Sequence, residues 1–186
     1  MKLSLNLLLL PLALGAAISV RDDARRGTQT VKGLGERKQE IVKAGGNTMD
    51  MAIAMLESDA MDASTYPYGD GKTGDATNFG IFKQNWMMLR TSATEFLGQK
   101  PEDVKNGEIL NTVLSKDIKA RHDGEKKYGF DVWYAGHRNG QSGLDNPNTQ
   151  DINNYRSAVK WIKSQLEGDK KYQSDDTRFW VEVVAI

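Results

Sequence analysis

The sequence contains no cysteine, only two histidines and no excess of either charge. Without cysteine there is no disulfide framework, no thiolate zinc site and no cysteine nucleophile. His122 and His137 lie far apart in the chain, so we expect neither a metal site nor any other cofactor. The 25 basic residues balance 25 acidic ones, which argues against a nucleic-acid partner. A chain of 186 residues predicts one domain with a core of its own.

The N-terminus has the pattern of a secretory signal peptide. Lys2 precedes an apolar run from Leu3 to Leu14, and small residues follow it. This order is typical of a leader that is removed on secretion, and the run is shorter than the ~20 residues of a membrane span. We therefore expect a signal peptide at residues 1–19, an extracellular location and no membrane association. A buried N-terminal helix is the alternative, which Pro11 disfavours.

The next residues, 20–33, are polar and include the dibasic pair Arg25-Arg26. They read either as a short propeptide that ends at Arg26 or as a disordered arm. In this interpretation, residues 34–186 then form a single domain.

The pattern along residues 34–186 is mainly helical. Apolar periodicity and end signals predict helices at 34–44, 48–56, 108–127 and 149–166, and residues 79–90 lead into a further helix. Asn47 or Thr48 caps the second of these helices, and Glu57 closes it. Residues 58–78 are rich in turn signals, 129–143 are neither clean helix nor strand, and 178–186 read as a strand. The expected fold class is α+β, mainly helical with a small β part.

Glu57 is the main candidate for a catalytic residue, because it ends an apolar helix just before an Asp-rich loop. A carboxyl group at the edge of a buried helix loses solvation, which favours its protonated form and lets it donate a proton to a leaving oxygen. Less buried carboxylates of the loop stay ionised and can act as base. Glycoside hydrolysis uses such a pair. The alternative is a helix-end acid in a salt bridge or cap, which the spacing alone favours.

Flat aromatic side chains suit the apolar faces of sugar rings. The candidates in and after the loop are Tyr66, Tyr68, Trp86, Trp133 and Tyr134. For Trp86 a place in the core is an equal alternative, whereas we assign the Gly-flanked Trp133-Tyr134 pair to a cleft. The loop oxygens of Asp70, Asp75 and Asn78 do not have the spacing of a calcium-binding loop.

The segments ESDAM and YPYGDGKTGDATNFGIFKQNW resemble glycoside hydrolase family 134, the lysozyme-fold endo-β-1,4-mannanases. The resemblance is dense from Glu57 to Arg90 and continues more loosely through YAGHRNG to the last helix. It implies a lysozyme-like fold, with a small β-hairpin region lining a substrate cleft, and an inverting endo-mannanase. Glu57 would be the general acid and Asp70 the general base. Asp75 is the alternative base or a substrate contact.

Asn78 bears on this mechanism. It stands at the hairpin position where retaining lysozymes place their second carboxylate, and an amide cannot form a glycosyl ester there. The second carboxylate must then come from elsewhere in the loop, and a separation of about 6.5–9.5 Å from the acid leaves room for the water of an inverting reaction.

Further substrate contacts are expected on the hairpin and in YAGHRNG. They are Asn78, Phe79, Gln84, Asn85 and His137. For His137 a satisfied surface or core histidine is an equal alternative, and Lys83 reads as a solvated charge.

The expected partner is β-1,4-mannan or a manno-oligosaccharide, bound by a monomer. One alternative is a lysozyme-type hydrolase of peptidoglycan or chitin, although the near-neutral charge favours a neutral polysaccharide. The other is a non-catalytic secreted carbohydrate-binding protein, against which the presence of both Glu57 and Asp70 argues.

Overall fold

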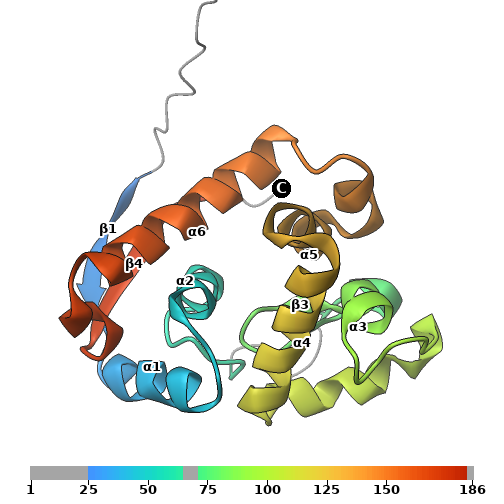
Figure 1. Cartoon of the computed structure of the whole chain (residues 1–186), viewed down its shortest axis with the longest axis horizontal. Coiled ribbons are helices and arrows are strands. Elements are labelled where there is room, and N and C mark those ends of the chain that lie inside the picture. Colours follow the sequence, from blue (N-terminus) through green and yellow to red (C-terminus); the bar gives the residue numbers. More distant parts are fainter. Residues whose placement is uncertain (1–24, 65–70, 184–186) are drawn as a thin grey trace, which may run out of the picture.

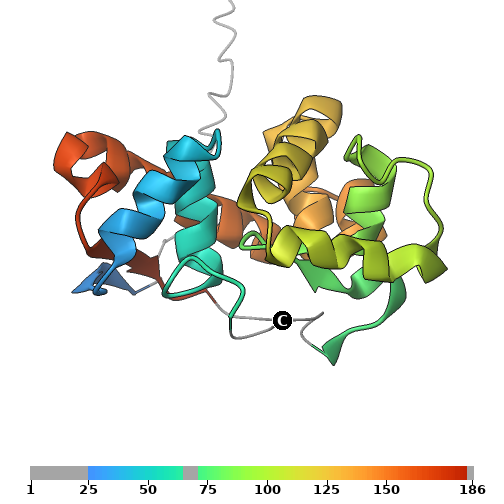
Figure 2. The same ribbon diagram turned by 90° about the horizontal axis from the view of Figure 1, so that it is seen from below.

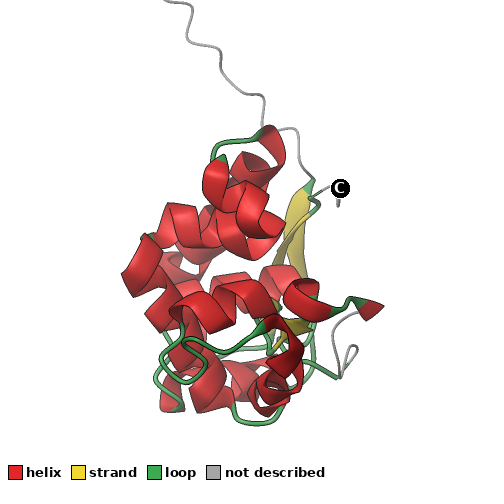
Figure 3. Cartoon of the chain, turned by 90° about the vertical axis from the view of Figure 1, so that its right-hand side faces the viewer, coloured by secondary structure: helices red, strands yellow, loops and turns green. Residues whose placement is uncertain are grey.

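The computed structural model describes residues 25–64 and 71–183 (Figure 1). The described chain is mainly helical with short antiparallel strands, which confirms the expected fold class (Figure 3). Its elements in order are β1 (Arg26–Thr30), α1 (Leu34–Lys43), α2 (Thr48–Glu57), the 3-10 turn η2 (Gly74–Ala76), β2 (Asn78–Phe79), β3 (Gln84–Asn85), α3 (Trp86–Ser92), the 3-10 helix η3 (Pro101–Asn111), α4 (Leu114–Tyr128), α5 (Phe130–Asp145), α6 (Gln150–Gly168), η4 (Lys170–Gln173) and β4 (Thr177–Val181).

Two groups of elements lie side by side. Figures 1 and 2 show α1, α2 and the β1–β4 pair at one end of the molecule and α3, η3 and α4 at the other, and α6 contacts both α2 and α5. The larger hydrophobic cluster joins α2, α5 and α6, and a smaller one surrounds Phe79, Trp86 and Phe96. The short hairpin of β2 and β3 contributes to both clusters, with Phe79 in the smaller one and Ile81 and Phe82 in the larger one.

Helix α2 begins and ends where the sequence predicts. Asn47 is the cap: its side chain accepts hydrogen bonds from the amides of Met49 and Asp50, while the Asp50 carboxylate accepts one from the Asn47 amide. This reciprocal capping box satisfies amides that the first helical turn leaves open. The middle of the helix is buried, and the chain turns extended at Ser58. Glu57 therefore sits at the boundary between the core and the surface.

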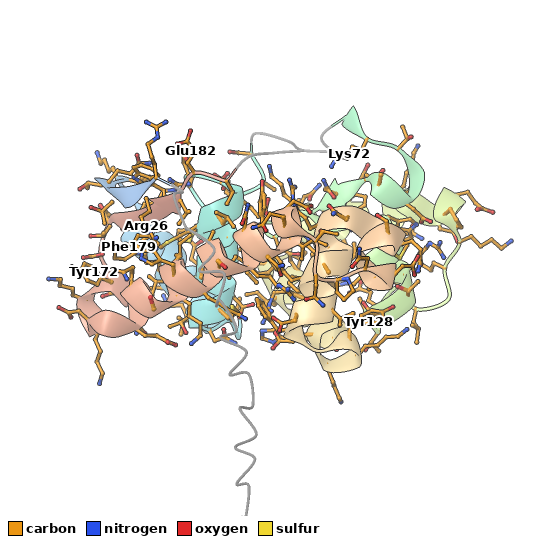
Figure 4. The ribbon with its side chains drawn as sticks, turned by 90° about the horizontal axis from the view of Figure 1, so that it is seen from above. Arg26, Lys72, Tyr128, Tyr172, Phe179 and Glu182 are labelled. Carbon is orange, nitrogen blue, oxygen red and sulfur yellow. The ribbon has the colours of Figure 1, made fainter. Side chains whose placement is uncertain are left out.

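The β1–β4 pair joins the two ends of the described chain. The strands run antiparallel, with Arg26 opposite Val181 and Thr30 opposite Thr177. Figure 4 shows Arg26, Phe179 and Tyr172 together at this end of the molecule. Residues 26–30 of the expected polar arm are thus a strand of the domain, and the disordered-arm interpretation is wrong for them. The expected signal peptide at residues 1–19 lies outside the described residues.

A buried lysine anchors the C-terminal segment to α1. The Lys38 ammonium donates hydrogen bonds to the carbonyls of Tyr172, Asp175 and Thr177 at 2.6–2.7 Å. Burial lowers the pKa of Lys38, against the opposing charge of Asp175. The three carbonyls supply the partners that a desolvated ammonium needs.

Two expected elements differ from the structure. The single helix expected at 108–127 is split, because the backbone at Val113 is not helical and η3 ends before α4 begins. Residues 129–143, expected to be irregular, belong largely to α5, which is kinked at Asn139 and Gly140. Its glycines allow close packing: a Cβ at Gly136 would lie 2.5 Å from the Met88 sulfur. The Gly-rich composition therefore reflects tight helix contacts here.

Within the described residues, no helix is both long and apolar enough to cross a membrane.

Candidate active site

A pocket of about 550 Å³ opens where α2, the hairpin, α5 and α6 meet. Figure 4 shows Lys72, from one edge of this pocket, on the opposite side of the molecule from Tyr128. The described residues that line the pocket are Leu56, Glu57, Lys72, Asp75, Ala76, Asn78, Lys83, Asn85, Met87, His137, Arg138, Asn139, Gly140, Gln141 and Tyr155. Five expected site residues are among them: Glu57, Asp75, Asn78, Asn85 and His137.

Glu57 presents a largely buried carboxyl group to this pocket. Its side chain is 14% exposed, and its Oε1 lies 3.3 Å from Nε2 of His137. The last turn of α2 fixes the backbone of Glu57, and the pocket provides an open side for a ligand. A carboxyl group so placed can exchange a proton with a bound molecule.

His137 is held by the core behind it. Its ring stacks on Trp133 with 5.3 Å between centroids and an interplanar angle of 5°. Its Nδ1 is buried and has no hydrogen-bond partner among the described residues. A buried N–H without a partner costs more than a buried acceptor without one. We therefore assign the proton to Nε2, so that His137 donates to Glu57.

Asn85 joins the hairpin, α3 and α5. Its Oδ1 accepts a hydrogen bond from the Met88 amide at the start of α3. Its Nδ2 donates to the carbonyls of Gly136 and His137, each at 2.9 Å. These carbonyls precede the kink of α5, where the helical ladder is interrupted and carbonyls need other partners. Asn85 therefore fixes the turn of α5 that carries His137.

Asp75 lies in the pocket wall as an ion-paired residue. Its two carboxylate oxygens accept hydrogen bonds from Nε and Nη2 of Arg90, both at 2.7 Å. The pair raises the pKa of Arg90 through its hydrogen bonds with Asp75. A bidentate pair of this kind holds the carboxylate in a fixed position.

A buried carboxyl group, Asp117, shapes the hairpin from below. It accepts hydrogen bonds from the Ile81 amide at 2.7 Å and the Gln84 side chain at 2.8 Å. Burial raises the pKa of Asp117 to about 7, against these hydrogen bonds. Gly80 packs on it with a φ of +72°, and a Cβ there would lie 2.1 Å from Oδ1 of Asp117. The sequence analysis missed this residue.

Several expected sugar contacts lie in the core instead. Trp86 is fully buried and donates its indole N–H to the Lys100 carbonyl. Trp133 packs between Gly124 and His137, and Tyr134 is buried beside it. None of these rings lines the pocket in the described chain, because each fills space between helices. Placing the Trp133-Tyr134 pair in the cleft was therefore wrong.

Two hairpin residues also turn inward. Phe79 is fully buried against Trp86, with ring centroids 6.2 Å apart. Gln84 is committed to Asp117. Both positions support the hairpin from inside rather than line the pocket. Three further candidates, Tyr66, Tyr68 and Asp70, lie outside the described residues.

The structure adds pocket residues that the sequence did not single out. Arg138 places its guanidinium 3.9 Å from the ring centroid of Tyr155, and both line the pocket. Burial, partly opposed by the charge of Arg138, raises the pKa of Tyr155. Tyr155 belongs to the apolar stripe of α6, so its periodicity indicated a core position. In the sequence, only the position of Arg138 directly after His137 pointed to a place in the site.

No group of three or more His, Asp or Glu side chains that could hold a metal ion occurs in residues 25–64 or 71–183.

The mainly helical α+β architecture, with the largely buried carboxyl group of Glu57 in the wall of an open pocket, is that of the lysozyme-like fold class. Residues 35–183 match the model of glycosyl hydrolase family 134, and the chain belongs to this family. It is accordingly a glycoside hydrolase. A comparison with curated proteins found no match.

Proposed function

We propose that this glycoside hydrolase is a secreted, monomeric endo-β-1,4-mannanase that cleaves linear mannan with inversion. The observation that carries the proposal is the position of Glu57, largely buried yet open to the pocket. In the reaction, Glu57 donates a proton to the glycosidic oxygen as the bond to the anomeric carbon breaks. An ionised aspartate on the other side of the sugar takes a proton from the attacking water.

Two features favour Asp70 as that base. Asn78 lines the pocket on the hairpin, where its amide cannot serve as a nucleophile or as a base. Asp75 has both carboxylate oxygens bound by Arg90. Proton abstraction by Asp75 would compete with this pair, so Asp70, the other candidate from the sequence, is the better choice. A separation of about 6.5–9.5 Å from Glu57 would admit the water.

Mannan is proposed from the family and from the charge balance. The 25 basic and 25 acidic residues give no excess that would attract an anionic cell wall. The pocket edge combines charged and amide side chains, including Lys72, Lys83 and Asn78, which suit the hydroxyl groups of a sugar.

The test is to compare reducing-sugar release from linear β-1,4-mannan, chitin and peptidoglycan. Proton NMR of the mannan products soon after mixing then gives the stereochemistry. The proposal expects release from mannan and initial appearance of the α-anomer. Release from chitin or peptidoglycan alone would contradict the substrate, initial β-anomer would contradict Asp70 as a water-activating base, and binding to mannan without release would indicate a carbohydrate-binding protein.

A further inference from the structure

We propose that His137 is a positioning residue that assigns separate tasks to the two oxygens of Glu57. Oε1 is held by the His137 N–H, so the transferable proton resides on Oε2 and faces the substrate. The inference rests on the proposed function, because it concerns the proton that Glu57 donates.

The first support is the contact geometry. Nε2 of His137 lies 3.3 Å from Oε1 of Glu57, and both side chains are largely buried, at 4% and 14% exposure. Catalytic hydrogen bonds are often long in the absence of substrate and tighten when it binds. Only one oxygen of Glu57 is engaged in this contact, which leaves the other for the pocket.

The second support is the fixed tautomer. Nδ1 of His137 is buried without a partner among the described residues, so the ring proton belongs on Nε2. A neutral histidine of this form can only donate to Glu57. It cannot accept the acidic proton through Nε2, and the proton is therefore kept on the oxygen that faces the sugar.

The third support is the rigidity of the imidazole. One face of the imidazole is covered by the parallel ring of Trp133, with 5.3 Å between the centroids. Its backbone carbonyl accepts a hydrogen bond from Asn85 at 2.9 Å. Residues that hold a reacting group in one orientation contribute to the rate by avoiding reorganisation in the transition state.

The proton balance of the step is simple. The proton leaves Oε2 of Glu57 for the glycosidic oxygen, which also receives the electron pair of the breaking C–O bond. Glu57 becomes a carboxylate, and the His137 N–H stabilises the charge that forms on it. The stabilisation grows as the proton departs, so it acts on the transition state more than on bound substrate.

The experiment compares two variants on two substrates. His137→Phe keeps a ring against Trp133 and removes the donor, whereas His137→Gln keeps an N–H donor at a similar distance from the backbone. One substrate is linear mannan, whose leaving sugar needs a proton. The other is a 2,4-dinitrophenyl manno-oligosaccharide, whose leaving group departs without one.

We expect His137→Phe to lower kcat on mannan by about 10²-fold, with KM changed by less than about threefold. On the dinitrophenyl substrate, kcat should fall by no more than about threefold, and His137→Gln should recover most of the activity on mannan. A merely structural role would reduce both substrates alike. Equal losses on the two substrates, or an unchanged kcat on mannan, would overturn the proposal.

The matched control is His122→Phe. His122 also places its Nε2 near a carboxylate, 3.0 Å from Asp50, but it lies outside the pocket lining. This variant should leave the ratio of the two kcat values at the wild-type level. Should His137→Phe fail to fold, His137→Leu takes its place, because it also removes the donor and should lower the ratio of kcat on mannan to kcat on the dinitrophenyl substrate by more than about tenfold. An unchanged ratio in that variant would overturn the proposal. Wild-type protein that does not cleave mannan would instead refute the proposed function itself.

Discussion

Asp75 and Arg90 form a bidentate ion pair in the pocket wall, with both hydrogen bonds at 2.7 Å. The pair joins the η2 turn to α3, and it occupies the carboxylate of Asp75, which the sequence offered as the alternative base. Asp75→Asn leaves one acceptor for two donors, and we expect it to cost about 1 kcal/mol of unfolding free energy, since the carboxylate is 38% exposed. It should retain kcat within about tenfold, whereas Asp70→Asn should lower kcat by 10²–10⁴-fold, roughly the contribution of a general base.

Steady-state kinetics on mannan and urea unfolding check this prediction. Isothermal titration of each variant with mannohexaose establishes whether binding is retained. If Asp75→Asn abolishes turnover and Asp70→Asn does not, the base has been assigned to the wrong residue.

Glu57→Gln removes the transferable proton while keeping the shape of the side chain. Its amide oxygen can still accept the hydrogen bond from His137. We expect kcat on mannan to fall by about 10³-fold or more, with the thermal midpoint almost unchanged. Glu40→Gln is the control, because Glu40 is 57% exposed and pairs with Arg37 on the surface. A Glu57→Gln variant with near wild-type turnover would exclude Glu57 as the acid.

The raised pKa of Asp117 should make the free energy of unfolding depend on pH. Its folded-state pKa of about 7 lies above its ordinary value of 3.8. The folded state therefore binds this proton more tightly than the unfolded state. The contribution of the protonated Asp117 to the free energy of unfolding is fully present below about pH 4. It is lost as the pH rises through about 7, by at most about 4 kcal/mol.

The comparison with Asp117→Asn isolates this contribution, since other groups titrate in both proteins. The variant itself should be less stable by about 1–3 kcal/mol at low pH, because an amide cannot accept from both Ile81 and Gln84. Urea unfolding from about pH 4.5 to about pH 8 should show the difference in unfolding free energy moving by about 2–4 kcal/mol in favour of the variant. A constant difference across this range would contradict the prediction.

Gly80→Ala should be strongly destabilising. The backbone there has a positive φ, and a Cβ would meet Asp117 at 2.1 Å. Gly98 is the matched control, because its φ of +83° is similar and nothing lies within 4 Å of its added Cβ. We expect Gly98→Ala to cost about 1 kcal/mol from backbone strain and Gly80→Ala more than about 3 kcal/mol. If chemical denaturation showed the same loss of unfolding free energy for both variants, the hairpin would have shifted to accommodate the added Cβ, and the prediction would be wrong.

Asn85→Asp separates the two roles of Asn85. The carboxylate keeps the cap of α3 and loses the donor to Gly136 and His137. We expect a cost of about 2–3 kcal/mol and a faster hydrogen exchange of residues 136–141. Asn47→Asp is the control at another cap whose side chain only accepts, and it should cost less than about 1 kcal/mol. Unchanged exchange at the α5 kink would refute the anchoring role of Asn85.

The position of Glu57 was predictable because its causes are local. A capping residue, a run of buried positions and a helix stop all lie within the segment from Asn47 to Ser58. The hairpin candidates Asn78 and Asn85 also reached the pocket, as the resemblance implied. Their neighbours Phe79 and Gln84 turned inward, as alternation along a strand requires, since successive side chains point to opposite faces.

The remaining features depend on contacts between distant segments. Asp117 meets Ile81 across 36 positions of sequence, and Lys38 meets Thr177 across 139. Whether Trp133 faces a cleft or a core is decided by the helix packed against it, which here presents Gly124. Composition around a tryptophan cannot carry that information.

In the antiparallel ribbon, β1 can pair only after β4 has been synthesised. Five residues near the start of the described chain find their pairing partner only when Thr177–Val181 are present. During synthesis β1 therefore stays unpaired until Thr177–Val181 have emerged. Contacts of such high sequence separation slow folding, so we expect this pairing to form late. Because Arg26 ends beside Val181, a short peptide could join the two ends and new termini could be opened elsewhere.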